Sequence, residues 1–125
     1  MKDEIQSIGA PAAIGPYSQG ICTKELVFIS GQLPINPENG DMPKDVAEQT
    51  RQSLVNAKAI LEAANLDMSK VVKTTILLTD IDDFNQVNKM YETFFSKPYP
   101  ARSCFAVAAL PKNASVEIEI IAVKE

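Results

Sequence analysis

The sequence of 125 residues contains no histidine. Histidine is the commonest general base near neutral pH and the commonest protein ligand of transition metals. Its absence excludes Ser-His-Asp and Cys-His nucleophilic machinery within this chain. A zinc site would have to combine the two distant cysteines, Cys22 and Cys104, with carboxylates, so we expect no metal site. Proton chemistry in such a chain falls to carboxylates, lysine, tyrosine or cysteine.

The sequence also lacks a long apolar run and a cysteine framework. No apolar stretch approaches the roughly 18 residues that a membrane span needs. The segment Met1–Glu4 carries mixed charge rather than an apolar signal core. The two cysteines form neither a CxxC pair nor a disulfide framework. We therefore expect a cytoplasmic protein with reduced thiols and no membrane partner.

Basic residues and glycine-rich phosphate loops are scarce. The chain has 12 Lys and Arg against 16 Asp and Glu, a formal net charge of -4. This acidic balance disfavours nucleic acid as a partner. Neither GxGxxG nor GxxxxGK[ST] occurs, so nothing indicates a nucleotide cofactor. We expect a protein that works without a cofactor.

The apolar pattern of residues 1–125, the length of one domain, predicts five strands and two helices. Asp45 has the form of a helix N-cap, and Asn65 is a plausible left-handed helix end. The order β-β-α-β-α-β-β predicts an α+β fold with a single mixed β-sheet and two helices on one face. The strands are expected over 20–23, 26–30, 71–79, 102–108 and 115–123, and the helices from 45 to about 64 and after 80–83.

The last predicted strand has two apolar-containing faces. One face carries Val116, Ile118, Ile120 and Ala122, and the other carries Glu117, Glu119, Ile121 and Val123. Two helices can cover only one face of the sheet. The second face then exposes apolar side chains, which predicts a closed homo-oligomer.

Arg102 is the first candidate site residue. It lies two positions before Cys104 in a predicted strand, so both side chains project from the same face. The guanidinium fork suits a carboxylate and stays charged when it is desolvated. The ordinary alternative is a salt bridge to Glu117 or Glu119. Without a histidine to activate its thiol, Cys104 itself is expected to be a small buried hydrophobic residue.

Glu117 is a candidate general base. A glutamate in a partly apolar interface can have a raised pKa and can orient or activate a water. The ordinary alternative is a rim carboxylate paired with Lys or Arg. Glu119 shares the same face, and spacing alone does not rank the two.

Four further residues could meet a ligand. Tyr17 follows a Gly-Pro turn that presents its ring at a loop edge, where packing is the ordinary explanation. Ser30 and Gly31 end a strand, where glycine allows close approach of a ligand or simply a turn. Asn88 falls on the apolar stripe of the second helix, and its amide needs partners from the backbone, a neighbouring subunit or a ligand.

Five motifs, together and in register, resemble those of the RidA (YjgF-type) family. The resemblance covers the chain from about Ile8 to Val123 and implies a fold like that of trimeric chorismate mutase, with sheets inside and helices outside. The motifs are Gly15-Pro-Tyr-Ser-Gln19, Ser30-Gly-Gln-Leu-Pro34, Val87-Asn88 with Tyr91, Pro100-Ala-Arg-Ser-Cys104 and Val116-Glu-Ile-Glu119. The resemblance therefore implies a homotrimer with sites between subunits.

The resemblance also implies an activity, that of an enamine/imine deaminase. Such an enzyme hydrolyses 2-aminoacrylate, 2-iminopropanoate and 2-iminobutanoate, released by pyridoxal-phosphate enzymes, to 2-oxo acids and ammonia. By resemblance, Arg102 binds the substrate carboxylate and Glu117 positions or activates the attacking water. The remaining pocket lining would come from Tyr17, Ser30, Gly31, Asn88 and the backbone of Cys104.

There are three alternatives to this function. A non-catalytic binder of small carboxylates such as 2-oxo acids would use the same Arg102 site. A ribonuclease or translation inhibitor is disfavoured by the acidic charge and by the absence of histidine. Chorismate mutase activity would rest on fold analogy alone.

Overall fold

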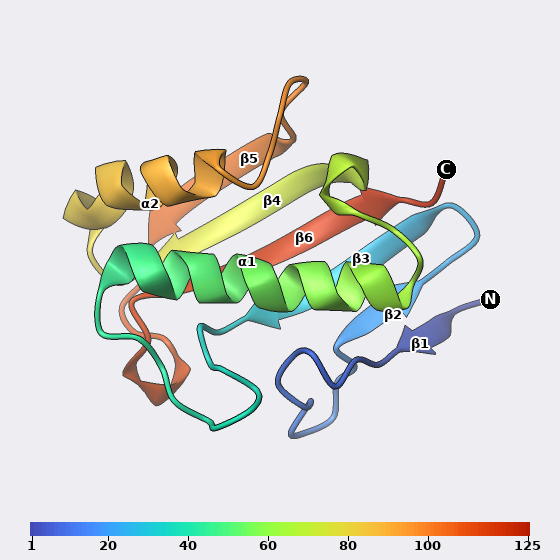
Figure 1. Cartoon of the computed structure of the whole chain (residues 1–125), viewed down its shortest axis with the longest axis horizontal. Helices are drawn as coiled ribbons and strands as arrows, with labels where there is room; N and C mark the ends of the chain where they lie inside the picture. Colours follow the sequence, from blue (N-terminus) through green and yellow to red (C-terminus); the bar gives the residue numbers. More distant parts are fainter.

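Six strands form one mixed sheet, and two α-helices lie on one of its faces (Figure 1). The computed structural model describes all residues, 1–125. The strands are β1 (Asp3–Ile5), β2 (Gly20–Cys22), β3 (Leu26–Gln32), β4 (Val71–Leu78), β5 (Ala101–Ala106) and β6 (Val116–Val123). The helices are α1 (Val46–Ala63) and α2 (Phe84–Glu92), with short 3-10 turns η1 (Met68–Lys70), η2 (Ile81–Asp83) and η3 (Pro111–Asn113).

The strand order is β1-β2-β3-β6-β4-β5, and every pair is antiparallel except β4–β5. The parallel pair follows from the α2 crossover, because a parallel connection cannot be a tight hairpin. The expected single mixed sheet with two helices on one face is thus confirmed. The expected strand count was wrong by one. The missed β1 has only three residues, two of them exposed, and it is held by backbone pairing to β2.

The helix boundaries follow the local sequence signals. The Asp45 carboxylate accepts a hydrogen bond from the backbone N–H of Glu48 at 3.1 Å, which caps α1. Asn65 takes a left-handed conformation with a φ of 63° just beyond the end of α1. Leu54, Ile60 and Leu61 of α1 are fully buried against the sheet. Neither helix combines the length and apolarity that a membrane crossing needs.

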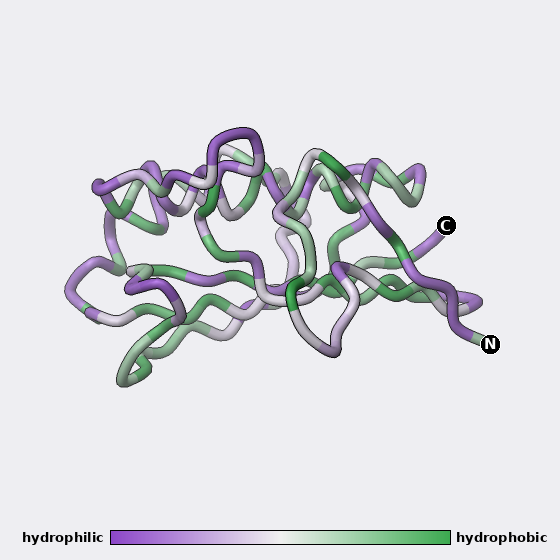
Figure 2. Tube along the Cα trace, turned by 90° about the horizontal axis from the view of Figure 1, so that it is seen from below, coloured by the Kyte–Doolittle hydropathy of each residue, from purple (hydrophilic) through white to green (hydrophobic).

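The helices cover one side of the sheet only. Figure 2 shows both helices in one layer and the strands in a second layer. We call the side without helices the open face; it carries Ile21, Phe28, Phe105, Glu117, Glu119 and Ile121. On this face Phe28 remains 41% exposed and Phe105 remains 49% exposed. The mixed face expected from the last strand is therefore present and uncovered in the single chain.

Candidate active site

Strand β5 places Arg102 beneath helix α2. In the β4–β5 register Arg102 pairs with Thr74, whose side chain is fully buried on the helix side of the sheet. Registered residues on parallel strands point to the same face, so Arg102 also lies on the helix side. Its guanidinium carbon lies 5.0 Å from the ring centroid of Tyr91 and 5.5 Å from that of Phe84. Both rings belong to α2.

Cys104 lies on the same face as Arg102, as the two-residue spacing predicts. It pairs with Ile76, is half-buried and packs against the hydrophobic core. Burial raises the pKa of its thiol, while the charge of Arg102 acts in the opposite direction. A thiol with a raised pKa is a poor nucleophile at neutral pH, so the chemistry of this face does not depend on a thiolate.

Arg102 lines a cleft of about 510 Å³. The cleft is lined by Asn88, Tyr91, Glu92, Tyr99, Pro100 and Arg102. The Oδ1 atom of Asn88 is buried and has no hydrogen-bond partner within the chain. A buried acceptor without a donor is costly, so such an atom favours a ligand or a neighbouring chain that supplies one. The cleft lining thus contains a cation and an amide side chain whose oxygen has no partner within the chain.

Glu117 lies on the open face, because its neighbours Val116 and Ile118 are fully buried on the other side. The carboxylate is half-buried beside Gly31. A Cβ atom at Gly31 would lie 2.9 Å from Oε2 of Glu117, so the glycine leaves the space that this carboxylate occupies. Burial, followed by the nearby charge of Glu119, raises the pKa of Glu117. A raised pKa makes the Glu117 carboxylate a stronger proton acceptor than an ordinary glutamate.

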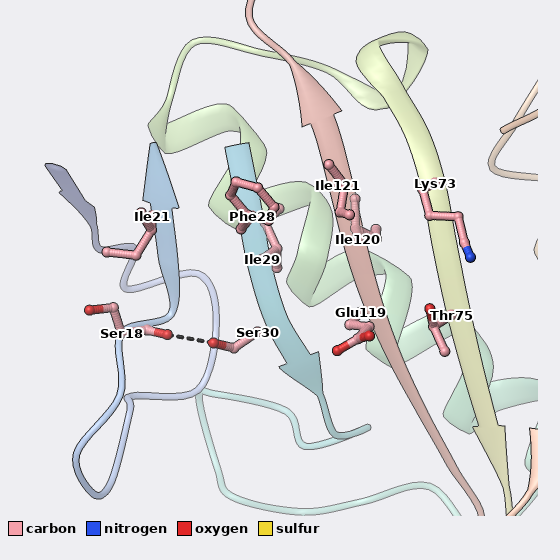
Figure 3. A pocket seen from close by; sticks show the side chains of 10 residues that line it. All are labelled: Ser18, Ile21, Phe28, Ile29, Ser30, Lys73, Thr75, Glu119, Ile120 and Ile121. Carbon is pink, nitrogen blue, oxygen red and sulfur yellow. Dashed lines mark hydrogen bonds between the residues drawn. The ribbon is translucent and has the colours of Figure 1, made fainter. Parts of the chain in front are cut away.

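Glu119 has different surroundings. Its side chain is exposed and lines an open-face cavity of about 310 Å³ together with Ser30, Lys73 and Thr75 (Figure 3). The Ser30 hydroxyl donates a hydrogen bond of 2.6 Å to the backbone carbonyl of Ser18, drawn as a dashed line in Figure 3. The structure therefore distinguishes the two glutamates that sequence spacing left equivalent: Glu117 is the half-buried one with the perturbed pKa.

Tyr17 stands in the loop between β1 and β2, and its side chain is 54% exposed. Buried Gln19 holds this loop in place. Its amide nitrogen donates to the carbonyls of Ser7, Ala10 and Pro11 at 3.1, 3.3 and 2.7 Å, and its oxygen accepts from Ser7 N at 2.7 Å. The ring is thus presented at a loop edge, as the Gly-Pro turn predicts.

The site residues fall into two clusters on opposite faces of the sheet. Arg102, Asn88 and Cys104 lie on the helix side, whereas Glu117, Gly31 and Ser30 lie toward the open face. The two clusters do not meet within one chain, because the sheet separates them. No group of three Cys, Asp or Glu side chains is placed to hold a metal ion.

Sequence reasoning missed part of the surroundings of Arg102. It placed an apolar stripe on the second helix but singled out neither Phe84 nor Thr74 as a site residue. The Thr74 and Tyr91 hydroxyl oxygens lie 2.7 Å apart in a buried hydrogen bond. The spacing of Phe84 and Tyr91 indicated a shared helix face. The strand residue that meets this face depends on the β4–β5 pairing, which the sequence does not reveal.

The fold and the two clusters define a class: a small α+β protein with an arginine-containing cleft suited to a carboxylate ligand. Residues 7–124 match the family model described as Endoribonuclease L-PSP, and the chain belongs to that family. The chain is 51% identical, over 127 aligned residues and 99% of each chain, to the 2-iminobutanoate/2-iminopropanoate deaminase of Escherichia coli strain K12.

Solved structures agree with this assignment. The crystal structure of the E. coli YjgF gene product superposes with a TM-score of 0.94 at 50% identity, covering 98% of this chain and 99% of that one. The crystal structure of E. coli TdcF with bound serine gives a TM-score of 0.94 at 46% identity, with the same coverage. The RidA (YjgF-type) resemblance drawn from five short motifs is thereby confirmed.

Proposed function

We propose that this protein is an enamine/imine deaminase that hydrolyses 2-iminobutanoate and 2-iminopropanoate to 2-oxo acids and ammonia. The observation that carries the proposal is that Arg102 lines the same cleft as Asn88, whose buried Oδ1 has no partner within the chain. The full-length identity of 51% to a relative named for this activity supports it. The substrates would come from pyridoxal-phosphate enzymes in the cytoplasm.

Substrate recognition requires a cation and a hydrogen-bond acceptor. The Arg102 fork binds the carboxylate of the imino acid, and Asn88 Oδ1 accepts a hydrogen bond from its nitrogen. The backbone of Cys104 completes this side of the pocket. Tyr17, Ser30 and Gly31 line the opposite side, next to Glu117. No cofactor is needed, because a protonated imine is already electrophilic at carbon.

Glu117 is the proton carrier of the reaction. As water adds to the iminium carbon, the Glu117 carboxylate takes a proton from the water, and a neutral carbinolamine forms. The protonated Glu117 then gives this proton to the amino nitrogen. The C–N bond breaks with its electron pair leaving on ammonia, while the Glu117 carboxylate takes the hydroxyl proton as the C=O bond forms. Glu117 then passes this proton to the departing ammonia, which leaves as ammonium, and returns to its carboxylate form. The raised pKa of Glu117 makes its carboxylate a stronger acceptor for the proton of the attacking water.

The complete site requires more than one copy of the chain, and we propose a homotrimer with sites between subunits. Arg102 and Glu117 lie on opposite faces of one sheet, so a substrate of three or four carbons does not reach both in a single chain. The exposed rings of Phe28 and Phe105 on the open face supply apolar area for such contacts.

The direct test supplies freshly formed substrate. A threonine dehydratase generates 2-iminobutanoate in situ, and the formation of 2-oxobutanoate and ammonia is followed with and without the purified protein. Acceleration by catalytic amounts of protein supports the deaminase. Binding of 2-oxobutanoate without acceleration would instead support the non-catalytic carboxylate binder. Cleavage of RNA without acceleration would favour a ribonuclease, which the net charge of -4 and the lack of histidine disfavour.

A further inference from the structure

We propose that Phe84, Tyr91 and Thr74 form a positioning unit that holds the Arg102 guanidinium in its carboxylate-binding orientation. The role of Arg102 as carboxylate anchor rests on the proposed function. The role of the positioning unit rests on contacts within the chain. Tyr91 also lines the cleft, whereas Phe84 and Thr74 do not.

Arg102 needs such support because it lies on an edge strand. Strand β5 is at the end of the sheet, and the Arg102 side chain is exposed. A long side chain in this setting samples many rotamers, and ordering it upon binding reduces affinity. The rings of Tyr91 and Phe84 lie 5.0 and 5.5 Å from the guanidinium carbon, within the range of cation–π attraction. They restrict the guanidinium without using its hydrogen-bond donors.

Helix α2 supplies both rings at the spacing that this support requires. Phe84 and Tyr91 are seven residues apart, two turns of helix, so they lie on the same side of α2. Arg102 thus lies against two rings that are two turns apart on one face of α2. A cation held between two rings keeps a defined direction, whereas one ring would leave it free to swing.

Thr74 holds the Tyr91 ring in place. Tyr91 is 5% exposed, its ring packs against Phe95 at a centroid distance of 4.6 Å, and its hydroxyl oxygen lies 2.7 Å from that of the fully buried Thr74. Thr74 is also the β4 residue that pairs with Arg102 in the sheet. One strand position therefore sets the place of both the arginine backbone and the ring that orients its side chain.

Loss of this unit should weaken carboxylate binding more than it slows the chemical step. The carboxylate is bound in the substrate complex and in the transition state alike, so the effect falls on KM. The proton transfers occur at Glu117 in the open-face cluster, and the position of Glu117 does not change when the positioning unit is lost. We expect a rise in KM of roughly three- to tenfold, the cost of one newly disordered side chain.

The first experiment compares Thr74→Val and Tyr91→Phe with Thr50→Val. Thr50 is also fully buried, but its hydroxyl donates to the Val46 carbonyl within α1, away from the cleft. We expect Thr74→Val and Tyr91→Phe to raise KM and the dissociation constant of 2-oxobutanoate together, with kcat within about twofold of the wild-type value. The double variant should match the singles, because both remove the same hydrogen bond. Thr50→Val should keep the wild-type KM. An unchanged KM in Thr74→Val and Tyr91→Phe would overturn the proposal. An equal loss of kcat in these two variants and in Thr50→Val would also overturn it.

The second experiment is independent of activity. In the wild type, ring currents from Tyr91 and Phe84 should displace the NMR signal of the Arg102 Nε–H group. Tyr91→Leu should move it toward the position of a solvent-exposed arginine, and Tyr91→Phe should reduce the displacement in part, because the ring remains but is no longer fixed by Thr74. An Arg102 Nε–H signal at the wild-type position in both variants would refute the positioning role and leave the deaminase proposal intact. A displaced signal that responds as expected, in a protein that accelerates no imine hydrolysis, would refute the deaminase and leave the positioning role intact.

Discussion

At the scale of single residues, two groups with opposite surroundings carry the proposed chemistry. Arg102 is exposed on an edge strand and is supported by two aromatic rings. Glu117 is half-buried beside Gly31, and burial raises its pKa. Anchoring an anion requires a group that stays charged, whereas proton transfer requires one that can gain and lose a proton. Each residue has the environment that its task requires.

Replacement of Arg102 by alanine should remove most of the activity. A charge-assisted hydrogen bond contributes about 1.5–3 kcal/mol, which corresponds to a loss in kcat/KM of roughly 10- to 100-fold. The measurement is steady-state hydrolysis of 2-iminobutanoate, and light scattering checks that the oligomer survives. Arg102→Lys is the matched control, because it keeps the charge without the fork and should lose less. Full activity in Arg102→Ala would show that the carboxylate is held elsewhere.

Replacement of Glu117 by glutamine should lower turnover and alter the pH profile. The raised pKa means that the active carboxylate form is lost as pH falls through a value above the ordinary 4.5 of glutamate. Wild-type kcat should therefore decline in acid below that raised pKa and be retained above it. Glu117→Gln should lower kcat by about 10²- to 10⁴-fold and remove this acid limb, with binding of 2-oxobutanoate retained. Glu119→Gln serves as the comparison, and an acid limb lost there instead would reverse the assignment of the two glutamates.

At the scale of elements, buried amides on α1 tie the helix to the chain that precedes it. Asn56 is fully buried, and its side-chain nitrogen donates to the carbonyls of Leu33 and Ile35 at 3.1 and 2.9 Å. These carbonyls directly follow β3, which carries Ser30 and Gly31. These hydrogen bonds tie α1 to the segment where the chain leaves β3, just beyond Gly31.

Replacement of Asn56 by alanine should destabilise the protein. It leaves two partly buried carbonyls without their donor, which costs about 1–3 kcal/mol of unfolding free energy. Urea denaturation measures the loss, and Lys58→Ala, an exposed change on the same helix, should stay close to the wild type. Equal stability of the two variants would mean that water replaces the amide at little cost.

At the scale of the whole molecule, the sheet itself separates the two halves of the proposed site. The helix-side cluster around Arg102 and the open-face cluster around Glu117 belong to different surfaces of one chain. Contact between copies can bring the Arg102 cluster of one chain to the Glu117 cluster of another. Oligomerisation would then be part of the active site rather than an addition to it.

Coexpression of Arg102→Ala and Glu117→Gln chains tests this arrangement. A site between an Arg102→Ala chain and a Glu117→Gln chain keeps both wild-type groups in one of the two orientations. With random assembly, about a quarter of the sites should be intact, so the mixed oligomer should far exceed either variant alone. Variants that are folded separately and mixed without exchange provide the control. No recovery in verified mixed oligomers would place both groups in one chain.

Local signals determined much of this architecture. Asp45 and Asn65 mark the ends of α1 because capping and left-handed turns depend on neighbouring residues alone. Alternation in the last strand predicted which side chains face the helices and which face the open side. The family followed from five motifs in register. The short β1 was missed because three residues with two exposed charges carry no periodic signal.

The sequence by itself therefore determined the fold class, the chemistry available without histidine and the candidate residues Arg102 and Glu117. Tertiary structure alone decided how these residues are grouped. Pairing between β4 and β5 placed Thr74 beside Arg102, and packing of Glu117 against Gly31 separated its environment from that of Glu119. The physical reason is that strand pairing and burial depend on residues distant in the chain, whereas caps, turns and alternation depend on neighbours.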